Sequence, residues 1–249
     1  MSPLALSIVI FLLVLGGIFF GAVFRRVLPG HHVSKETQDV VRLGAGLIAT
    51  IAALVLGLLI SASKASFDTR STQIKQITAN LILLDNLLAQ YGPEAMPLRK
   101  AMRDAITPFV DRVWHEKATR GPFAATIEGE RLYLALYALS PQNETQQSLK
   151  ARALQVSADL AQTRLLLFVE ADNAIPAPFL AILVLWLVVI FATFSLFSDL
   201  NATALTFLCI FALSASCAIY LILELNQPFK GLMMISEAPL RNALTPLAQ

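Results

Sequence analysis

Few side chains in this sequence have the types and spacings that support catalysis or metal binding. His31 and His32 are adjacent, so their side chains point in different directions, and no Cys, Asp or Glu lies beside them at metal-ligand spacing. The sequence has no phosphate-binding P-loop, no GxSxG nucleophile motif and no HExxH zinc motif. We therefore expect neither enzymatic activity nor a bound metal or cofactor.

The most informative carboxylate is Glu224, at the end of the last apolar run of the chain. Two roles are open for it. It is either an interfacial cap or ion pair, for example with Lys230, or a group at a pore mouth or ion site. Glu128, Glu130 and Arg131 are expected to be ordinary solvated charges.

The composition is that of a membrane protein. Of 249 residues, 56% are hydrophobic and 14% are charged, whereas charged residues make up about a quarter of a typical soluble domain. The net charge of +2 is too small to indicate nucleic-acid binding. Uncharged apolar runs long enough to cross a bilayer as helices lie at residues 4–24, 43–63, 179–197 and 202–223. Arginines follow the first run rather than precede it, so it is expected to be a retained anchor and not a signal peptide.

These runs predict an all-α integral membrane protein with four transmembrane helices. Residues 1–63 would form a first transmembrane hairpin and residues 177–224 a second. Residues 64–176 would form a helical-bundle soluble domain between the second and third spans, and residues 225–249 a C-terminal tail. Four spans place both termini and the soluble domain on the same side of the membrane.

Small residues recur at helical spacing in two of the apolar runs. In the second run they are four residues apart and share a helix face: Ala45, Ala49, Ala53, Gly57 and Ser61. Such a face lets another backbone approach closely, so we interpret it either as a helix-packing face or as the lining of an assembly axis. Gly17 and Gly21 of the first run have the same spacing, which predicts a close helix contact there.

The second span is expected to continue beyond the membrane as one helix. After Lys64 the apolar residues change to a heptad-like spacing, at Ile74, Ile77, Leu81, Leu84 and Leu88. No proline interrupts the run before Pro93, and Gly92 is a suitable stop. The pattern therefore predicts a single helix of roughly 48 residues, about 70 Å long, that ends at Tyr91.

The rest of the predicted soluble segment is expected to form shorter helices. Residues 93–114 are expected to form a helix that Pro108 kinks or breaks, with an apolar stripe at Leu98, Met102, Ala105 or Ile106, Phe109 and Val113. A loop is expected at 115–128 and a short helix at 129–139. Pro141 is expected at the first position of a longer helix that runs towards residue 171.

Three stretches resemble a group of uncharacterised bacterial membrane proteins described as bestrophin-like. They are RRVLPGHHVS (25–34), GLIATIAALVLGLLISASKASFDTRS (46–71) and ELNQPFKGLMMISEAPLRNAL (224–244). Ser66, Phe67 and Asp68 match the start of the Ser-Tyr-Asp-Arg-Trp-Trp-like motif of bacterial bestrophins, and residues 69–71 depart from it. Pro228 and Phe229 match a Pro-Phe-Gly motif, with Lys230 inserted before Gly231.

This resemblance implies a pentameric, mostly anion-selective channel with four spans and a helical soluble domain between the second and third. It also implies that the second span lines the pore, with a neck near Ala53, Gly57 and Ser61. Bestrophin necks are bulky and apolar, whereas these three residues are small. Small side chains cannot narrow a pore of that width, so either the pore is wider here or this face packs helix against helix.

Two arguments place the soluble domain on opposite sides of the membrane. Loop 25–42 carries four basic residues and the C-terminal tail carries two, which favours a domain outside the cytoplasm. The bestrophin resemblance and the basic residues Lys64, Arg70 and Lys75 favour a cytoplasmic domain. Both placements of the soluble domain stay open. The membrane itself is expected to be the bacterial inner membrane. A reporter fused to Gln249 would decide between them, because the C-terminus shares the side of the domain.

Two functions are consistent with these observations. The first is a homo-oligomeric channel for small anions such as chloride, lined by the second span and assembled from copies of this chain. The second is a non-conducting membrane scaffold or stress-signalling protein whose helical domain binds a partner. The heptad-like seam motivates the second function, because such seams also dock partner helices. Copies of the chain, the lipid bilayer and inorganic anions are the expected partners, and nucleic acid is not expected.

Overall fold

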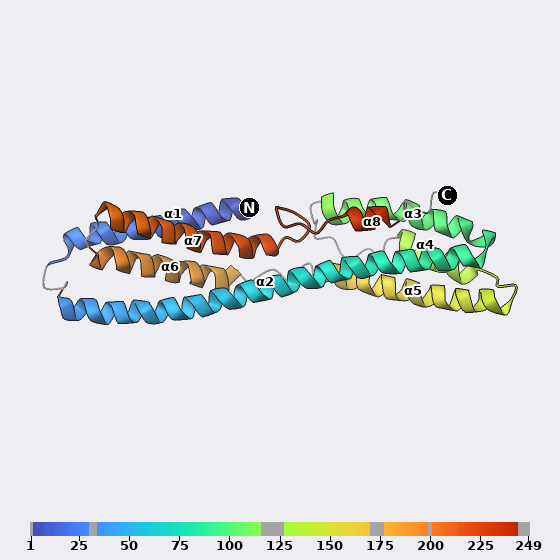
Figure 1. Cartoon of the computed structure of the whole chain (residues 1–249), viewed down its shortest axis with the longest axis horizontal. Helices are drawn as coiled ribbons and strands as arrows, with labels where there is room; N and C mark the ends of the chain where they lie inside the picture. Colours follow the sequence, from blue (N-terminus) through green and yellow to red (C-terminus); the bar gives the residue numbers. More distant parts are fainter. Residues whose placement is uncertain (1, 30–33, 116–126, 170–176, 199–200, 244–249) are drawn as a thin grey trace. The chain divides into compact units, whose positions relative to one another are not determined.

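The computed structural model describes residues 2–29, 34–115, 127–169, 177–198 and 201–243, and these residues form helices joined by turns. The chain divides into two compact units (Figure 1). The first contains Met1–Phe67 and Ala174–Gln227, and the second contains Asp68–Asn173 and Pro228–Gln249. The C-terminal segment from Pro228 is thus part of the second unit.

The first unit contains the predicted spans. The helices α1 (Pro3–Val27), α2 (Lys35–Tyr91), α6 (Ala177–Phe197) and α7 (Ala202–Leu225) are each long and apolar enough to cross a bilayer. Side-chain oxygens cap three of them: Ser2 accepts from the Ala5 amide, Ser34 from the Thr37 amide, and Asn201 from the Ala204 amide. The helices α1 and α2 thus begin before the apolar runs from which they were predicted, whereas α7 begins with its run at Ala202.

Close backbone contact joins α1 to α6. A Cβ atom on Gly17 would lie 2.9 Å from the carbonyl oxygen of Val188, and one on Gly21 would overlap the carbonyl of Ala192. The Ser195 hydroxyl donates a 2.6 Å hydrogen bond to the carbonyl oxygen of Ile18 across the same contact. The spacing of the two glycines therefore predicted this contact correctly.

The helix α2 runs without a break from Lys35 to Tyr91, over 57 residues. It exceeds the predicted length because its first turns precede the apolar run. At its C-terminal end Gly92 has a φ of 129°, a backbone conformation that residues with a Cβ rarely adopt. The predicted continuous helix and its glycine stop are both confirmed.

The heptad-like seam of α2 forms the core of the second unit. All of its members are at most 5% exposed: Ile74, Ile77, Leu81, Leu84 and Leu88. The same unit buries apolar side chains from α3 (Met96–Val110), α4 (Ile127–Ala138) and α5 (Glu144–Val169), among them Met102, Leu136 and Val156. The seam is therefore filled by its own chain and is not open to a partner helix.

Three details of the helices in the second unit differ from prediction. In α3 the buried stripe continues through Val110 to Trp114, whereas Phe109 and Val113 are half-buried. Pro108 does not break α3, and a π-helical turn follows at Asp111–His115. The helix α5 begins at Glu144 rather than at Pro141, because the side chain of Asn143 accepts a 2.8 Å hydrogen bond from the Gln146 amide and caps it. Most of the predicted loop 115–128 lies outside the described residues.

A buried ion pair links α2 to α3. The Arg99 guanidinium donates two 2.8 Å hydrogen bonds to the two carboxylate oxygens of Asp85, whose side chain is 1% exposed. This bidentate contact raises the pKa of Arg99, so the charge on the guanidinium is permanent. At the end of α2, burial raises the pKa of Tyr91, and the nearby charge of Glu94 adds to the effect.

Candidate functional site

The helix α2 is the least covered of the four spanning helices. Only 11% of its most apolar window is buried within the chain, against 28% for α1, 22% for α6 and 28% for α7. A helix that its own chain leaves open has to contact lipid, water or another copy. The candidate functional site is therefore the exposed side of α2 within the first unit.

The five small residues singled out in the sequence do not share one environment. Ala45 is 5% exposed, and Ala49 is half-buried and packs into a core cluster with Ala52 and Leu183. Ala53, Gly57 and Ser61 are exposed. The reason is geometric: a step of four residues exceeds one helical turn of about 3.6 residues, so a row at this spacing winds around the helix.

A straight row of small residues is present when steps of four residues are combined with a step of three. Its members are exposed and lie along one edge of α2: Gly46, Thr50, Ala53, Gly57 and Ser61. We call this row the small-residue edge. Within the described part of the chain, no side chain or neighbouring backbone comes within 4 Å of a Cβ placed on Gly46 or Gly57. This mixed spacing of three and four residues was the signal that could have identified Gly46 and Thr50 from the sequence.

A row of bulky apolar residues lies beside the small-residue edge. Its members are 41–70% exposed: Leu47, Ile51, Leu54 and Leu58. We call it the bulky edge. Exposed leucine and isoleucine side chains suit contact with acyl chains, whereas an edge without bulk suits close approach of another helix or a water-filled space. At its C-terminal end the small-residue edge continues to Lys64, whose ammonium lies 5.5 Å from the ring centre of Phe67.

The first family motif spans the boundary between the two units along the sequence of α2. Ser66 and Phe67 are half-buried and end the first unit, and Asp68 is exposed and begins the second. Two and five residues after Asp68, Arg70 and Gln73 are 5% and 8% exposed. Polar side chains thus enter the interior of the protein directly after this motif.

Glu224 is buried, with only 3% of its surface exposed. It lies in the last turn of α7, one turn after Tyr220, to which it is hydrogen-bonded. A buried carboxylate at the end of a spanning helix is costly unless its oxygens are satisfied, and the Tyr220 hydroxyl supplies one donor. Glu224 is therefore not an exposed interfacial charge in a single copy of the chain.

The second motif forms a turn that binds the C-terminal segment to the second unit. The Ile235 amide donates a 2.7 Å hydrogen bond to the Pro228 carbonyl, and Gly231 within the turn has a φ of 96°. The ring of Phe229 packs edge-on against Trp114, with ring centres 5.2 Å apart. The Trp114 indole N–H donates a 2.8 Å hydrogen bond to the Ile235 carbonyl. Pro228, Phe229 and Gly231 thus have a structural role in this unit.

Replacing Trp114 by phenylalanine is expected to loosen the segment after Pro228. The substitution keeps an aromatic ring against Phe229 but leaves the buried Ile235 carbonyl without its donor, which costs about 1–3 kcal/mol. Limited proteolysis of the full-length protein should then cut this segment faster. Trp186→Phe, in the first unit, is the matched control and should leave this cleavage rate unchanged. Equal rates in Trp114→Phe and the native protein would contradict the assigned role of Trp114.

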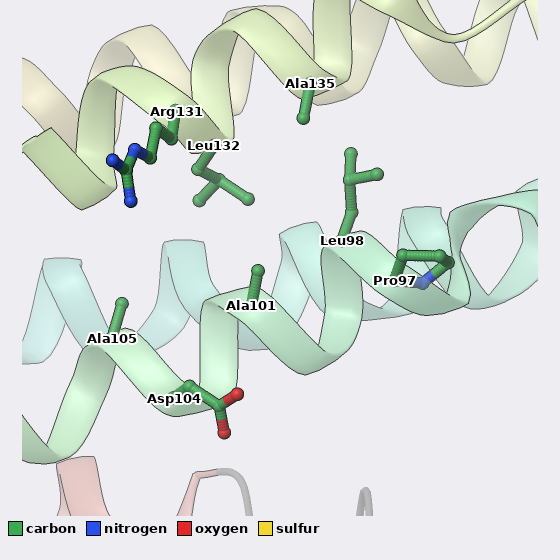
Figure 2. A pocket seen from close by; sticks show the side chains of 8 residues that line it. All are labelled: Pro97, Leu98, Ala101, Asp104, Ala105, Arg131, Leu132 and Ala135. Carbon is green, nitrogen blue, oxygen red and sulfur yellow. The ribbon is translucent and has the colours of Figure 1, made fainter.

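A groove of about 470 Å³ lies between α3 and α4 in the second unit (Figure 2). Apolar side chains from both helices line it: Pro97, Leu98, Ala101, Ala105, Leu132 and Ala135. Asp104 and Arg131 are its ionisable members, and Figure 2 shows the Asp104 carboxylate directed away from the facing helix. The lining is therefore mainly apolar, with Asp104 as its carboxylate.

The described residues also contain no group of three His, Cys, Asp or Glu side chains able to hold a metal ion. His31 and His32, for which the sequence indicates no metal site, lie outside the described residues.

Comparison with known proteins identifies the class. The family model described as the Bestrophin-like domain matches residues 10–240, so the chain belongs to the bestrophin-like family. A solved crystal structure described as that of a membrane protein superposes with a TM-score of 0.67, covering 96% of this chain and 99% of the other at 15% identity. At this identity the likeness shows a shared fold. A search of curated proteins gives no match.

Proposed function

We propose that this chain forms a homo-oligomeric bestrophin-like channel that conducts small anions such as chloride along an axis lined by α2. The observation that carries the proposal is the small-residue edge, which is exposed in a single chain although it lies within an apolar spanning helix. Closed rings are the usual form of such assemblies, and family resemblance favours a pentamer. The membrane is the bacterial inner membrane.

Selectivity for anions is supported by the charge at the end of the small-residue edge. A ring of copies would place one Lys64 per chain around the axis, and rings of cationic side chains favour anions. Lys64→Glu is expected to lower the permeability of chloride relative to potassium by several-fold, measured as a shift in reversal potential across a planar bilayer. Lys100→Glu, exposed on α3 and outside the proposed axis, is the charge-matched control. An unchanged reversal potential in Lys64→Glu would remove Lys64 from the pathway.

The direct test is chloride efflux from liposomes that contain the purified protein. Gly57→Phe is expected to reduce efflux at least tenfold with the oligomer intact, because it places a large ring on an edge that faces water. Leu58→Phe, on the bulky edge, is the matched control and should leave efflux unchanged. No efflux from folded native protein under varied ions and potentials would refute conduction.

A non-conducting scaffold or stress-signalling protein is the second candidate, and the lack of bulk on the small-residue edge favours it. Small side chains allow neighbouring copies to pack closely and to exclude water. In that case Gly57→Phe would dissociate the oligomer, and the native protein would show no flux. A partner would also have to bind a surface other than the heptad-like seam, which is buried in its own chain.

A further inference from the structure

Three consecutive bulky apolar side chains are exposed in the turn after α7. Leu232 is 83% exposed, Met233 43% and Met234 57%. Leu232 is more exposed than any other large apolar side chain in the described residues, including those on the spanning helices. We call residues 231–234 the apolar loop. A run of this kind outside a spanning helix marks a surface that contacts something other than water.

The apolar loop is anchored at both of its ends. The hydrogen bond from the Ile235 amide to the Pro228 carbonyl closes the turn, and the left-handed conformation of Gly231 reverses the chain within it. Shortly before the loop in the sequence, Phe229 packs against Trp114. Directly after the loop, Ile235 is buried, with 8% of its surface exposed. The exposure of the loop therefore comes from a defined turn whose two ends are anchored in the second unit.

We propose that the apolar loop inserts its side chains into the interfacial layer of the lipid bilayer and so docks the second unit on the membrane surface. The short chain segment between α7 and the loop supports contact with the bilayer. The spanning helix α7 ends at Leu225, so Leu232 follows after seven residues and lies at most about 25 Å from the end of that helix. The apolar layer is thus within reach of the loop.

The neighbouring charges also favour lipid. Lys230 directly precedes the loop, and a basic residue beside exposed apolar side chains is typical of segments that bind anionic lipid surfaces. The nearest carboxylate after the loop, Glu237, is paired with Arg241 at 3.1 Å, which reduces its repulsion of lipid phosphate. This docking goes beyond the proposed conduction and would hold equally for a channel or a scaffold.

The test uses an environment-sensitive fluorophore on single cysteines of the full-length protein in vesicles of phosphatidylcholine and phosphatidylglycerol. Cys209 and Cys217 are first replaced by alanine, and the label is placed at Leu232→Cys. Met234→Cys provides a second position in the same loop in case the first variant does not fold. Ser148→Cys, exposed on α5, is the matched control for a water-facing site. Lipid-borne nitroxide and aqueous iodide serve as the two quenchers.

Labels in the apolar loop are expected to emit at shorter wavelength than the label at position 148, to be quenched by nitroxide lipid and to be protected from iodide. Quenching by iodide equal to that at position 148 would show a loop in water and overturn the proposal. Protection from both quenchers would mean that protein covers the loop and would also overturn it. In that case a change in emission on mixing with excess unlabelled protein identifies a second copy as the cover.

Discussion

Replacing Arg99 by methionine is expected to destabilise the second unit by about 3–5 kcal/mol. The Asp85 carboxylate, 1% exposed, accepts both of its charged hydrogen bonds from Arg99 and cannot turn to water when that partner is removed. Methionine keeps much of the apolar length of the side chain, so the effect measures the lost charge pairing. In detergent, the melting temperature should fall by roughly 10 °C.

Arg152→Met is the matched control for this substitution. Arg152 is exposed on α5 and donates a 2.9 Å hydrogen bond to Gln155, a contact worth little in water. The control should shift the melting temperature by no more than about 2 °C, because a substitution at an exposed site changes the free energy of unfolding by about 0.5 kcal/mol or less. Similar small shifts in both variants would contradict the claim that the buried Asp85 carboxylate depends on Arg99.

Replacing Gly21 by alanine is expected to destabilise the first unit by about 1–3 kcal/mol. The added Cβ would overlap the Ala192 carbonyl and lie 3.1 Å from the Cβ of Ser195, so α1 and α6 would have to separate. Separation would also stretch the hydrogen bond from Ser195 to the Ile18 carbonyl. The measurement is the temperature at which the detergent-solubilised protein loses its monodisperse elution peak.

Gly16→Ala separates this packing effect from helix propensity. Gly16 lies on the same helix, and nothing comes within 4 Å of a Cβ placed there. Alanine stabilises a helix interior by up to about 1 kcal/mol over glycine, so this variant should be as stable as the native protein or more so. If Gly21→Ala were equally stable, the close contact between α1 and α6 would be contradicted.

Regular periodicity made much of the architecture predictable. Long uncharged runs located the spanning helices, and the heptad-like spacing from Ile74 to Leu88, without an interrupting proline, extended α2 far beyond the apolar run. These signals are strong because every residue of a long helix contributes to the same pattern. Residue type and spacing also predicted the end of α2 at Gly92 and the close helix contact at Gly17 and Gly21.

Features that depend on partners distant in sequence could not be predicted in this way. The α3 stripe passes through Val110 and Trp114 because the indole N–H meets the carbonyl of Ile235, 121 residues later. Ala45 and Ala53 lie about 80° apart around α2, and the α2 sequence alone does not indicate that Ala45 is the buried one and Ala53 the exposed one. Which side of α2 its own chain covers is decided by α6 and α7 and is not encoded in the α2 segment alone.

The most direct test of the account is thiol accessibility along α2 in protein-containing liposomes, read out as block of chloride efflux by a charged, membrane-impermeant methanethiosulfonate reagent. In a background without native cysteines, Gly57→Cys and Ser61→Cys on the small-residue edge are compared with Leu54→Cys and Leu58→Cys on the bulky edge. The account predicts block at positions 57 and 61 and none at 54 and 58. Block confined to the bulky edge, or efflux that none of the four modifications alters, would contradict a water-filled axis lined by Ala53, Gly57 and Ser61.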